Sequence, residues 1–481
     1  MRRPLVPVLV FLGMVVAIVS SLGAPLVPTI AVADGVSLAD AQWSLTITLL
    51  AGAVATPTMG RLGDGPRRRE VVLLALLAVS VGSVLAALPV PFWVLLVGRA
   101  LMGTGLGLTP LAMAAARDAM SGERSRSTVA LLSVTTVAGV GLGYPLTGVI
   151  ADNLSFRAAF GFGAVVALTA FAAALLVFPS TRGRVAPPLD VAGAVLIGAG
   201  LAGLLLTLSE LETWSLTSLL ALAVGSVGLL ALWVRQELHT PHPLVDLRLV
   251  RHRPVLTADL TGLLAGVGMY VLISLVIRFV QTPTIAGYGF GGSVVVAGLV
   301  LLPFSAASVL ASRTVPVLAR RTTPRLVLPL GCGVFVVGEL LFATSRSSLW
   351  ELFVVMGLAG FGVGCTFAAL PALIVAAVPP GETGSAMSFN QVLRYVGYST
   401  GSALSATILQ ASTPAGQRLP ADSGYTTAAL FGCAVLIVAG VASALLPARA
   451  TTAAVAPADG VTTDGVITDG VTTDGVPIGA R

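Results

Sequence analysis

A short loop at residues 60–69 holds the densest group of charges in the chain, with the sequence Gly-Arg-Leu-Gly-Asp-Gly-Pro-Arg-Arg-Arg. It lies between two apolar runs, in a chain of which only 10% is Asp, Glu, Lys or Arg. Asp64 can accept hydrogen bonds from arginine side chains or from backbone N–H groups at a helix N-terminus. Such a contact biases a two-state equilibrium if it forms in only one conformation, so we predict that Asp64 is a conformational latch. The alternative is a turn whose basic cluster only orients the chain in a membrane.

Two arginines lie inside apolar runs. Arg99 is about seven residues from the start of its run, or about 10 Å deep at 1.5 Å per residue. A central arginine costs about 2.5–3.5 kcal/mol on membrane-insertion scales, so such a residue usually faces a polar interior and has a function. Snorkelling to the outer interface is the alternative for Arg99. Arg394 and Asn390, one helical turn apart, predict either a polar cavity wall or a buried structural cluster.

Acids in apolar surroundings are candidates to take up and release a proton. Four acids lie in or beside the apolar runs: Asp152, Asp259, Glu339 and Glu351. Glu339 is the most deeply embedded, whereas Asp259 is about a turn inside its run, where it could also be an N-terminal helix charge. We take Glu339, Asp259 and the buried cation Arg99 as candidates for proton coupling.

Small residues and one proline recur along another run, at Gly139, Gly143, Pro145 and Gly148. Small residues allow helices to approach closely, and proline removes a backbone hydrogen bond and kinks a helix. This pattern predicts a helix that bends or slides, although close packing by glycine alone is the alternative.

The composition indicates what positions these residues. The chain is 56% hydrophobic with a mean hydropathy of +0.96, whereas soluble domains are about 45–50% apolar with about 25% charged residues. A membrane-spanning helix needs about 20 apolar residues. Fourteen runs of that kind are predicted, at 5–31, 42–60, 71–90, 92–116, 127–151, 157–178, 190–209, 214–234, 255–280, 289–312, 326–344, 349–378, 385–410 and 424–446. The first run is too long for a signal peptide, so it is predicted to be the first membrane helix.

The arginines predict the orientation. All 27 basic residues are arginine; with fourteen spans, 21 of them lie on the face that holds both termini and four lie on the opposite face. Positive residues gather on the cytoplasmic side of membrane proteins. Both termini are therefore predicted to be cytoplasmic, in the inner (plasma) membrane.

An internal repeat predicts the domain organisation. Residues 103–109, Gly-Thr-Gly-Leu-Gly-Leu-Thr, match residues 360–366, Gly-Phe-Gly-Val-Gly-Cys-Thr, at an offset of 257, and flanking loops agree at similar offsets. Chance similarity between glycine-rich helices is the alternative. We predict an N-terminal six-helix bundle (1–178), two inserted helices with a cytoplasmic loop (179–254), a C-terminal six-helix bundle (255–446) and a disordered cytoplasmic tail (447–481) with repeated Asp-Gly-Val.

These motifs together resemble the fourteen-span drug:proton antiporter branch of the major facilitator superfamily, over residues 5–446. Gly60, Leu62, Asp64, Arg68 and Arg69 match its loop signature, with Gly65 where arginine is usual and Arg67 where glycine is usual. The resemblance assigns Gly60, Asp64, Arg68 and Arg69 to the latch. Further matches are the Leu-Val-Gly-Arg of residues 96–99, with Gly103 and Gly105, and the antiporter signature at 139–148, with Tyr144 before the proline. The acid often found in the first helix is missing from residues 20–25.

The resemblance implies an all-α polytopic membrane protein that exports a small organic compound, such as an antibiotic or an amphipathic drug, in exchange for protons by alternating access. The alternative is a proton-coupled uptake permease, for which Tyr144 leaves room. A membrane-embedded enzyme would need a clustered acid or metal motif, which we do not find, and the sequence has no ATP-binding Walker motif. We therefore predict no enzyme activity, cofactor, metal or nucleic-acid partner. The expected partners are a small-molecule substrate, protons and the lipid bilayer, and the protein is expected to work as a monomer.

Overall fold

The computed structural model describes residues 5–22, 26–36, 38–179, 188–209, 214–321, 326–414 and 419–445, which contain helices, turns and no strand. The helices are α1 (Leu5–Ser21), α2 (Val27–Asp34), α3 (Leu38–Gly63), α4 (Arg68–Ala87), α5 (Phe92–Gly103), η2 (Thr104–Gly107), α6 (Leu108–Ala119), α7 (Gly122–Asn153), α8 (Phe156–Val177), α9 (Val191–Ser209), α10 (Leu216–His239), α11 (Leu247–Val250), α12 (Arg253–Gln281), η3 (Thr284–Ala286), α13 (Val294–Val300), α14 (Leu302–Arg321), α15 (Val327–Thr344), α16 (Leu349–Ala377), η5 (Pro380–Glu382), α17 (Thr383–Ala411) and α18 (Asp422–Leu445).

Within the described residues, every predicted apolar run coincides with one helix or with two or three consecutive helices. Ten helical segments among the described residues are long and apolar enough to cross a membrane by length and composition. The fold class is therefore that of an all-helical integral membrane protein. The count of fourteen spans and the four predicted domains stay predictions, and the tail at 447–481 lies outside the described residues.

Three predicted runs are interrupted, which is a correction to their expected continuity. The run 5–31 is divided between α1 and α2, and α2 begins with a proline in its first turn. The run 92–116 contains the 3-10 turn η2, and the run 289–312 is divided between α13 and α14, at Leu301. Proline lacks a backbone N–H and glycine is a poor helix former, so residues of these types make regular helices easier to interrupt.

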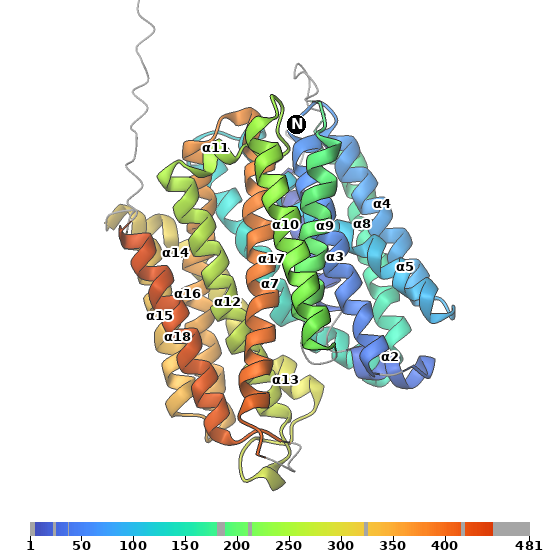
Figure 1. Cartoon of the computed structure of the whole chain (residues 1–481), viewed down its shortest axis with the longest axis vertical. Helices are drawn as coiled ribbons and strands as arrows, with labels where there is room; N and C mark the ends of the chain where they lie inside the picture. The colour runs from blue at the N-terminus through green and yellow to red at the C-terminus, as the bar shows by residue number, and fades with distance from the viewer. Residues whose placement is uncertain are drawn as a thin grey trace, which may run out of the picture. The chain divides into compact units, whose positions relative to one another are not determined.

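The helices form an interior in which segments far apart in the sequence meet (Figure 1). The most extensive pairs are α12 with α17, α14 with α16, α15 with α16, α4 with α8, and α15 with α18. Helices from the first 178 residues pack on helices from after residue 255: α3 and α6 contact α17, and α7 contacts α13, α14 and α16. The helices α9 and α10 pack on each other, and α9 also packs on α3 and α17. The helix α17 therefore lies at the meeting point of three parts of the chain.

Candidate functional site

The carboxylate of Asp64, just after α3, receives two backbone hydrogen bonds from the start of α17. The N–H of Gly384 donates to Oδ1 at 2.6 Å and the N–H of Ser385 donates to Oδ2 at 2.8 Å. The first N–H groups of a helix lack partners within the helix and carry its partial positive charge. Asp64, only 3% exposed, thus fills the N-terminus of a helix that lies 320 residues further along the chain.

Burial of Asp64 raises its pKa from 3.8 to about 6. The two N–H groups and the nearby Arg68 guanidinium act in the opposite direction, because they favour the charged carboxylate. Loss of water outweighs them here. The contact with α17 and the uptake of a proton by Asp64 are therefore linked, since the buried arrangement binds the proton more tightly than a solvated carboxylate does.

Arg68 and Arg69, from the same loop, have different partners. Arg68 is buried; its Nε donates to the carbonyl of Gly63 at 2.6 Å and its Nη1 forms an ion pair with Asp118 at 2.6 Å. It therefore supports the loop from the side of α6. Arg69 instead donates to the carbonyl of Leu175 at 2.7 Å, near the end of α8. This hydrogen bond is directed to α8 and not to α17, so Arg69 is not part of the contact between Asp64 and α17.

Gly60 lies where α3 and α17 approach most closely. A Cβ atom on Gly60 would be 2.1 Å from the hydroxyl oxygen of Ser388 and 2.8 Å from the carbonyl oxygen of Gly384. A Cβ on Gly384 would in turn be 2.6 Å from Oδ1 of Asp64. The two glycines therefore allow the approach that brings Asp64 onto the helix N-terminus.

A second contact on this face was not predicted as a site. Arg117, in the last turn of α6, donates through Nη2 to the carbonyls of Val375 at 2.9 Å and Val378 at 3.0 Å, and through Nη1 to the hydroxyl of Thr383. The carbonyls at a helix C-terminus carry partial negative charge. Arg117 thus binds the end of α16, as Asp64 binds the beginning of α17. In the sequence, Arg117 was distinguished only as one of the arginines that predict the orientation of the chain in the membrane.

The predicted bending residues lie in α7, which continues as a helix through Pro145. A Cβ on Gly139 would be 1.8 Å from Cβ of Ala17 in α1, and one on Gly143 would be 2.2 Å from the Ser21 hydroxyl oxygen. Those two glycines allow close packing of α7 on α1. Gly148 faces Val295 of α13.

Asp259 and Asn390, predicted for separate roles, are in contact. The amide Nδ2 of Asn390 donates to Oδ1 of Asp259 at 2.9 Å and to the carbonyl of Ala258 at 3.2 Å. Asp259 is 3% exposed, and its Oδ2 has no hydrogen-bond partner among the described residues. A crevice of about 10 Å³, room for about one water, reaches Asp259 beside Asp246 and Ser385.

The other proton-coupling candidates lie elsewhere. Arg99 is fully buried: Nε donates to the carbonyl of Ser44 at 2.8 Å, and the guanidinium lies 5.5 Å from the centre of the Phe160 ring. In the described part of the chain it makes no ion pair, so it has no acid beside it to tune. Glu339 lies in α15 facing α18, where a Cβ on Gly432 would be 2.3 Å from Oε1. Neither of its carboxylate oxygens has a hydrogen-bond partner within the described ranges.

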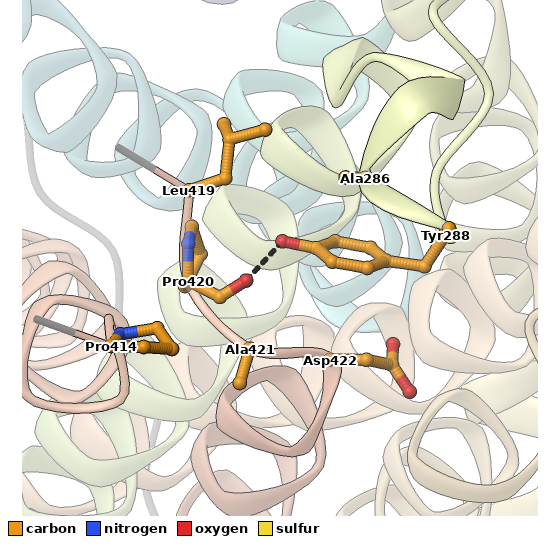
Figure 2. A pocket seen from close by; sticks show the side chains of 8 residues that line it. Ala286, Tyr288, Pro414, Leu419, Pro420, Ala421 and Asp422 are labelled. Atoms are coloured by element: carbon orange, nitrogen blue, oxygen red, sulfur yellow. Dashed lines mark hydrogen bonds between the residues drawn. The ribbon is translucent and has the colours of Figure 1, made fainter. Parts of the chain in front are cut away.

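A hollow of about 570 Å³ lies between residues 286–288 on one side and residues 414 and 419–422 on the other (Figure 2). Tyr288 points across it and donates its hydroxyl to the carbonyl of Pro420, with Asp422 alongside. Burial, and to a lesser degree Tyr425 and Asp422, raise the pKa of Tyr288 to about 12, so it stays a neutral donor. None of the predicted site residues lines this hollow.

Helices that meet across two parts of one chain, with a charged contact at one face, are an arrangement used by membrane transporters. The sequence profile of the Major Facilitator Superfamily matches residues 9–402 and, separately, 260–467. The chain belongs to this superfamily of transporters.

Relatives of known name agree with this family. The chain is 26% identical over 388 residues to the multidrug resistance protein B homolog of Mycobacterium tuberculosis, a match that covers 79% of this chain and 71% of the relative. It is 25% identical over 408 residues to the methyl viologen resistance protein SmvA of Salmonella typhimurium, with 82% and 80% covered. The structure of human MFSD10, an organic anion transporter, shares the fold with a TM-score of 0.61 at 18% identity, over 91% of this chain and 98% of that one.

Proposed function

We propose that this protein is a proton-driven exporter of a small organic compound that works by alternating access. The observation that carries the proposal is the pair of contacts from Asp64 to the start of α17 and from Arg117 to the end of α16. Both contacts lie at one face and join helices from the first 178 residues to helices from after residue 255. A contact that must break when that face opens is what alternating access requires.

The proposed architecture is fourteen spans, with residues 1–178 and 255–446 as the two rocking units and 179–254 as the insertion. The distribution of the arginines assigns the Asp64 face to the cytoplasm, together with both termini. In that orientation the latch closes the cytoplasmic face. With the cytoplasmic face closed, opening of the opposite face would let the exporter release its substrate and take up a proton from the outside.

Asp259 is our proposed proton carrier. It lies in α12 and accepts a hydrogen bond from Asn390 of α17; its other carboxylate oxygen has no partner among the described residues, and a water-sized crevice lies beside it. Glu339 is equally buried, but it faces α18 and not the helices that join the two units. A proton bound at Asp259 can therefore influence directly the helix that Asp64 latches, whereas one at Glu339 would act on it only through α18.

Export, and not uptake, is supported by two features. The glycines at 139 and 143, together with Pro145, match the signature that separates exporters from uptake members, and the relatives cited above carry names of drug resistance. Tyr144 departs from the signature, so the direction of transport needs a direct measurement.

The test is a drug-susceptibility panel in a host that lacks its own exporters, with and without a protonophore. Expression should raise resistance to at least one small organic compound, and the protonophore should abolish the increase. Asp259→Asn should behave like the protonophore, whereas Glu70→Gln, a change at a 70% exposed acid, should not. Increased sensitivity on expression would instead indicate uptake, and resistance that survives the protonophore would exclude proton drive.

A further inference from the structure

Four of the six tyrosines gather where the two units meet. Tyr270 of α12 stacks on Tyr398 of α17 with ring centres 4.6 Å apart, and Tyr395 lies edge-on to Tyr398 at 5.9 Å. Tyr144 of α7 is a close neighbour of Tyr270. Three helices, α7, α12 and α17, thus contribute tyrosines to this cluster.

Arg394 lies in the middle of this cluster and is 2% exposed. Its Nε and Nη2 donate to the hydroxyl of Tyr398 at 3.2 and 3.0 Å, and its Nη1 donates to Oε1 of Gln391 at 3.3 Å. The hydroxyl of Ser133, from α7, is 3.5 Å from Nη1. The guanidinium also covers the Phe367 ring, 3.8 Å from its centre.

All of these partners are neutral, which leaves a buried positive charge without an ion pair among the described residues. A buried charge is normally paired, because removing it from water costs several kcal/mol. Asp259, on the neighbouring helix α12, forms no ion pair with Arg394 in the described part of the chain; it accepts a hydrogen bond from Asn390, which lies one turn before Arg394 in α17. Charged residues within membranes usually mark a substrate path. We therefore place the unpaired charge of Arg394 on the proposed substrate path.

We propose that Arg394 and the surrounding tyrosines bind an organic anion that carries an aromatic ring, so that the exported compound supplies the missing negative charge. This inference rests on the proposed function and names its substrate class. A planar guanidinium matches a carboxylate with two parallel hydrogen bonds, and tyrosine faces stack on an aromatic ring. A cationic compound is disfavoured here by repulsion from Arg394, even though tyrosine faces alone would attract it.

The test compares three probes on the full-length purified protein: 2-naphthoate, its neutral isostere 2-naphthamide, and the dication methyl viologen. Titration calorimetry should show 2-naphthoate binding at least tenfold more tightly than 2-naphthamide, and methyl viologen binding most weakly. Arg394→Gln should remove the preference by weakening 2-naphthoate about tenfold or more, while 2-naphthamide changes less than twofold. Arg394→Lys should keep part of the preference, because it keeps the charge and loses the planar fork.

The control is Arg235→Gln, which removes one positive charge at an exposed position and should leave all three affinities unchanged. Equal affinity of the unmodified protein for 2-naphthoate and 2-naphthamide, or no binding of 2-naphthoate, overturns the inference. So does an Arg394→Gln variant that loses both ligands equally, because the residue would then be structural.

Transport in proteoliposomes separates this inference from the proposed function. Movement of methyl viologen or 2-naphthamide under a proton gradient, with no preference for 2-naphthoate, would overturn the substrate class and leave proton-driven export standing. Proton-independent movement of 2-naphthoate would support the substrate class and overturn proton drive.

Discussion

Closure of the Asp64 face should depend on pH. In the closed arrangement burial holds the pKa of Asp64 at about 6, whereas a solvated aspartate has the value 3.8. A group whose pKa is raised by closure stabilises the closed state fully at pH values below its pKa in the solvated state. This stabilisation is lost as the pH rises through its pKa in the closed state. Acidification should therefore favour closure, and the sensitive window lies between about pH 4 and pH 7.

The size of the effect follows from these two values. At pH 8 the carboxylate is charged in both states, so protonation contributes nothing to closure. At pH 5 the buried group is mostly protonated and the solvated group mostly charged, which should shift the ratio of closed to open molecules about tenfold toward closed. The charged groups that face Asp64 or its loop are Arg68, Arg61, Glu382 and Asp118, and they are paired with one another as Arg61–Glu382 and Arg68–Asp118.

The measurement is a distance distribution between labels on the Asp64 face, recorded from pH 5 to pH 8. Cysteines introduced at Glu70 and His252 suit this purpose, because both positions are exposed and the three native cysteines are buried. Asp64→Asn should remove most of the pH dependence, whatever its effect on the closed fraction at any one pH. Arg67→Gln, a change at a 73% exposed residue of the same loop, should leave the dependence intact.

Two results would refute the reasoning. A closed fraction that stays constant from pH 5 to pH 8 would mean that burial of Asp64 is not linked to closure. An unchanged slope in Asp64→Asn would assign the titration to another group.

Three further predictions use the same labels or the transport assay. Gly60→Ala should shift the population about ten- to a hundredfold toward the open state, since its Cβ would lie 2.1 Å from the Ser388 hydroxyl oxygen and such overpacking costs about 1–3 kcal/mol; an unchanged distribution would exclude this contact. Arg117→Gln should also open the face, by about tenfold or more, because hydrogen bonds from charged groups contribute about 1.5–3 kcal/mol; Arg67→Gln, at a 73% exposed position, is the matched surface change. Asp259→Asn should abolish proton-driven transport while substrate binding persists, and loss of binding as well would place Asp259 in the substrate site.

Hydropathy was sufficient to predict the fold class, because helices that cross a membrane must be long and apolar. Each predicted run lies on helix, and ten segments meet the length and hydropathy of a span. The breaks at η2 and Leu301 were missed, since a run of apolar residues remains apolar where its helix is interrupted. Hydropathy reports the environment of a residue and not the continuity of its backbone.

The contacts between residues of the site could not be predicted from the sequence, for a different reason. Asp64 and Gly384 are 320 residues apart, and Asp259 and Asn390 are 131 apart. The position of an acid along its run indicates its depth, but not the direction in which it faces. Glu339 was therefore taken as the most embedded acid, although depth alone could not show that it faces α18 and that Asp259 faces Asn390.

Each of the two contacts on the Asp64 face joins a charged side chain to backbone groups at a helix end. Only the charged side chain can be identified from the sequence. Asp64 and Arg117 contribute side chains of opposite charge, and their partners are the ends of two helices from after residue 255: N–H groups of α17 and carbonyls of α16. Backbone groups carry these partial charges whatever the side chains are. Substitutions of Asp64 and Arg117 should thus act through charge, whereas substitutions of Gly384 should act through size, because any side chain there would displace Asp64 from the helix N-terminus.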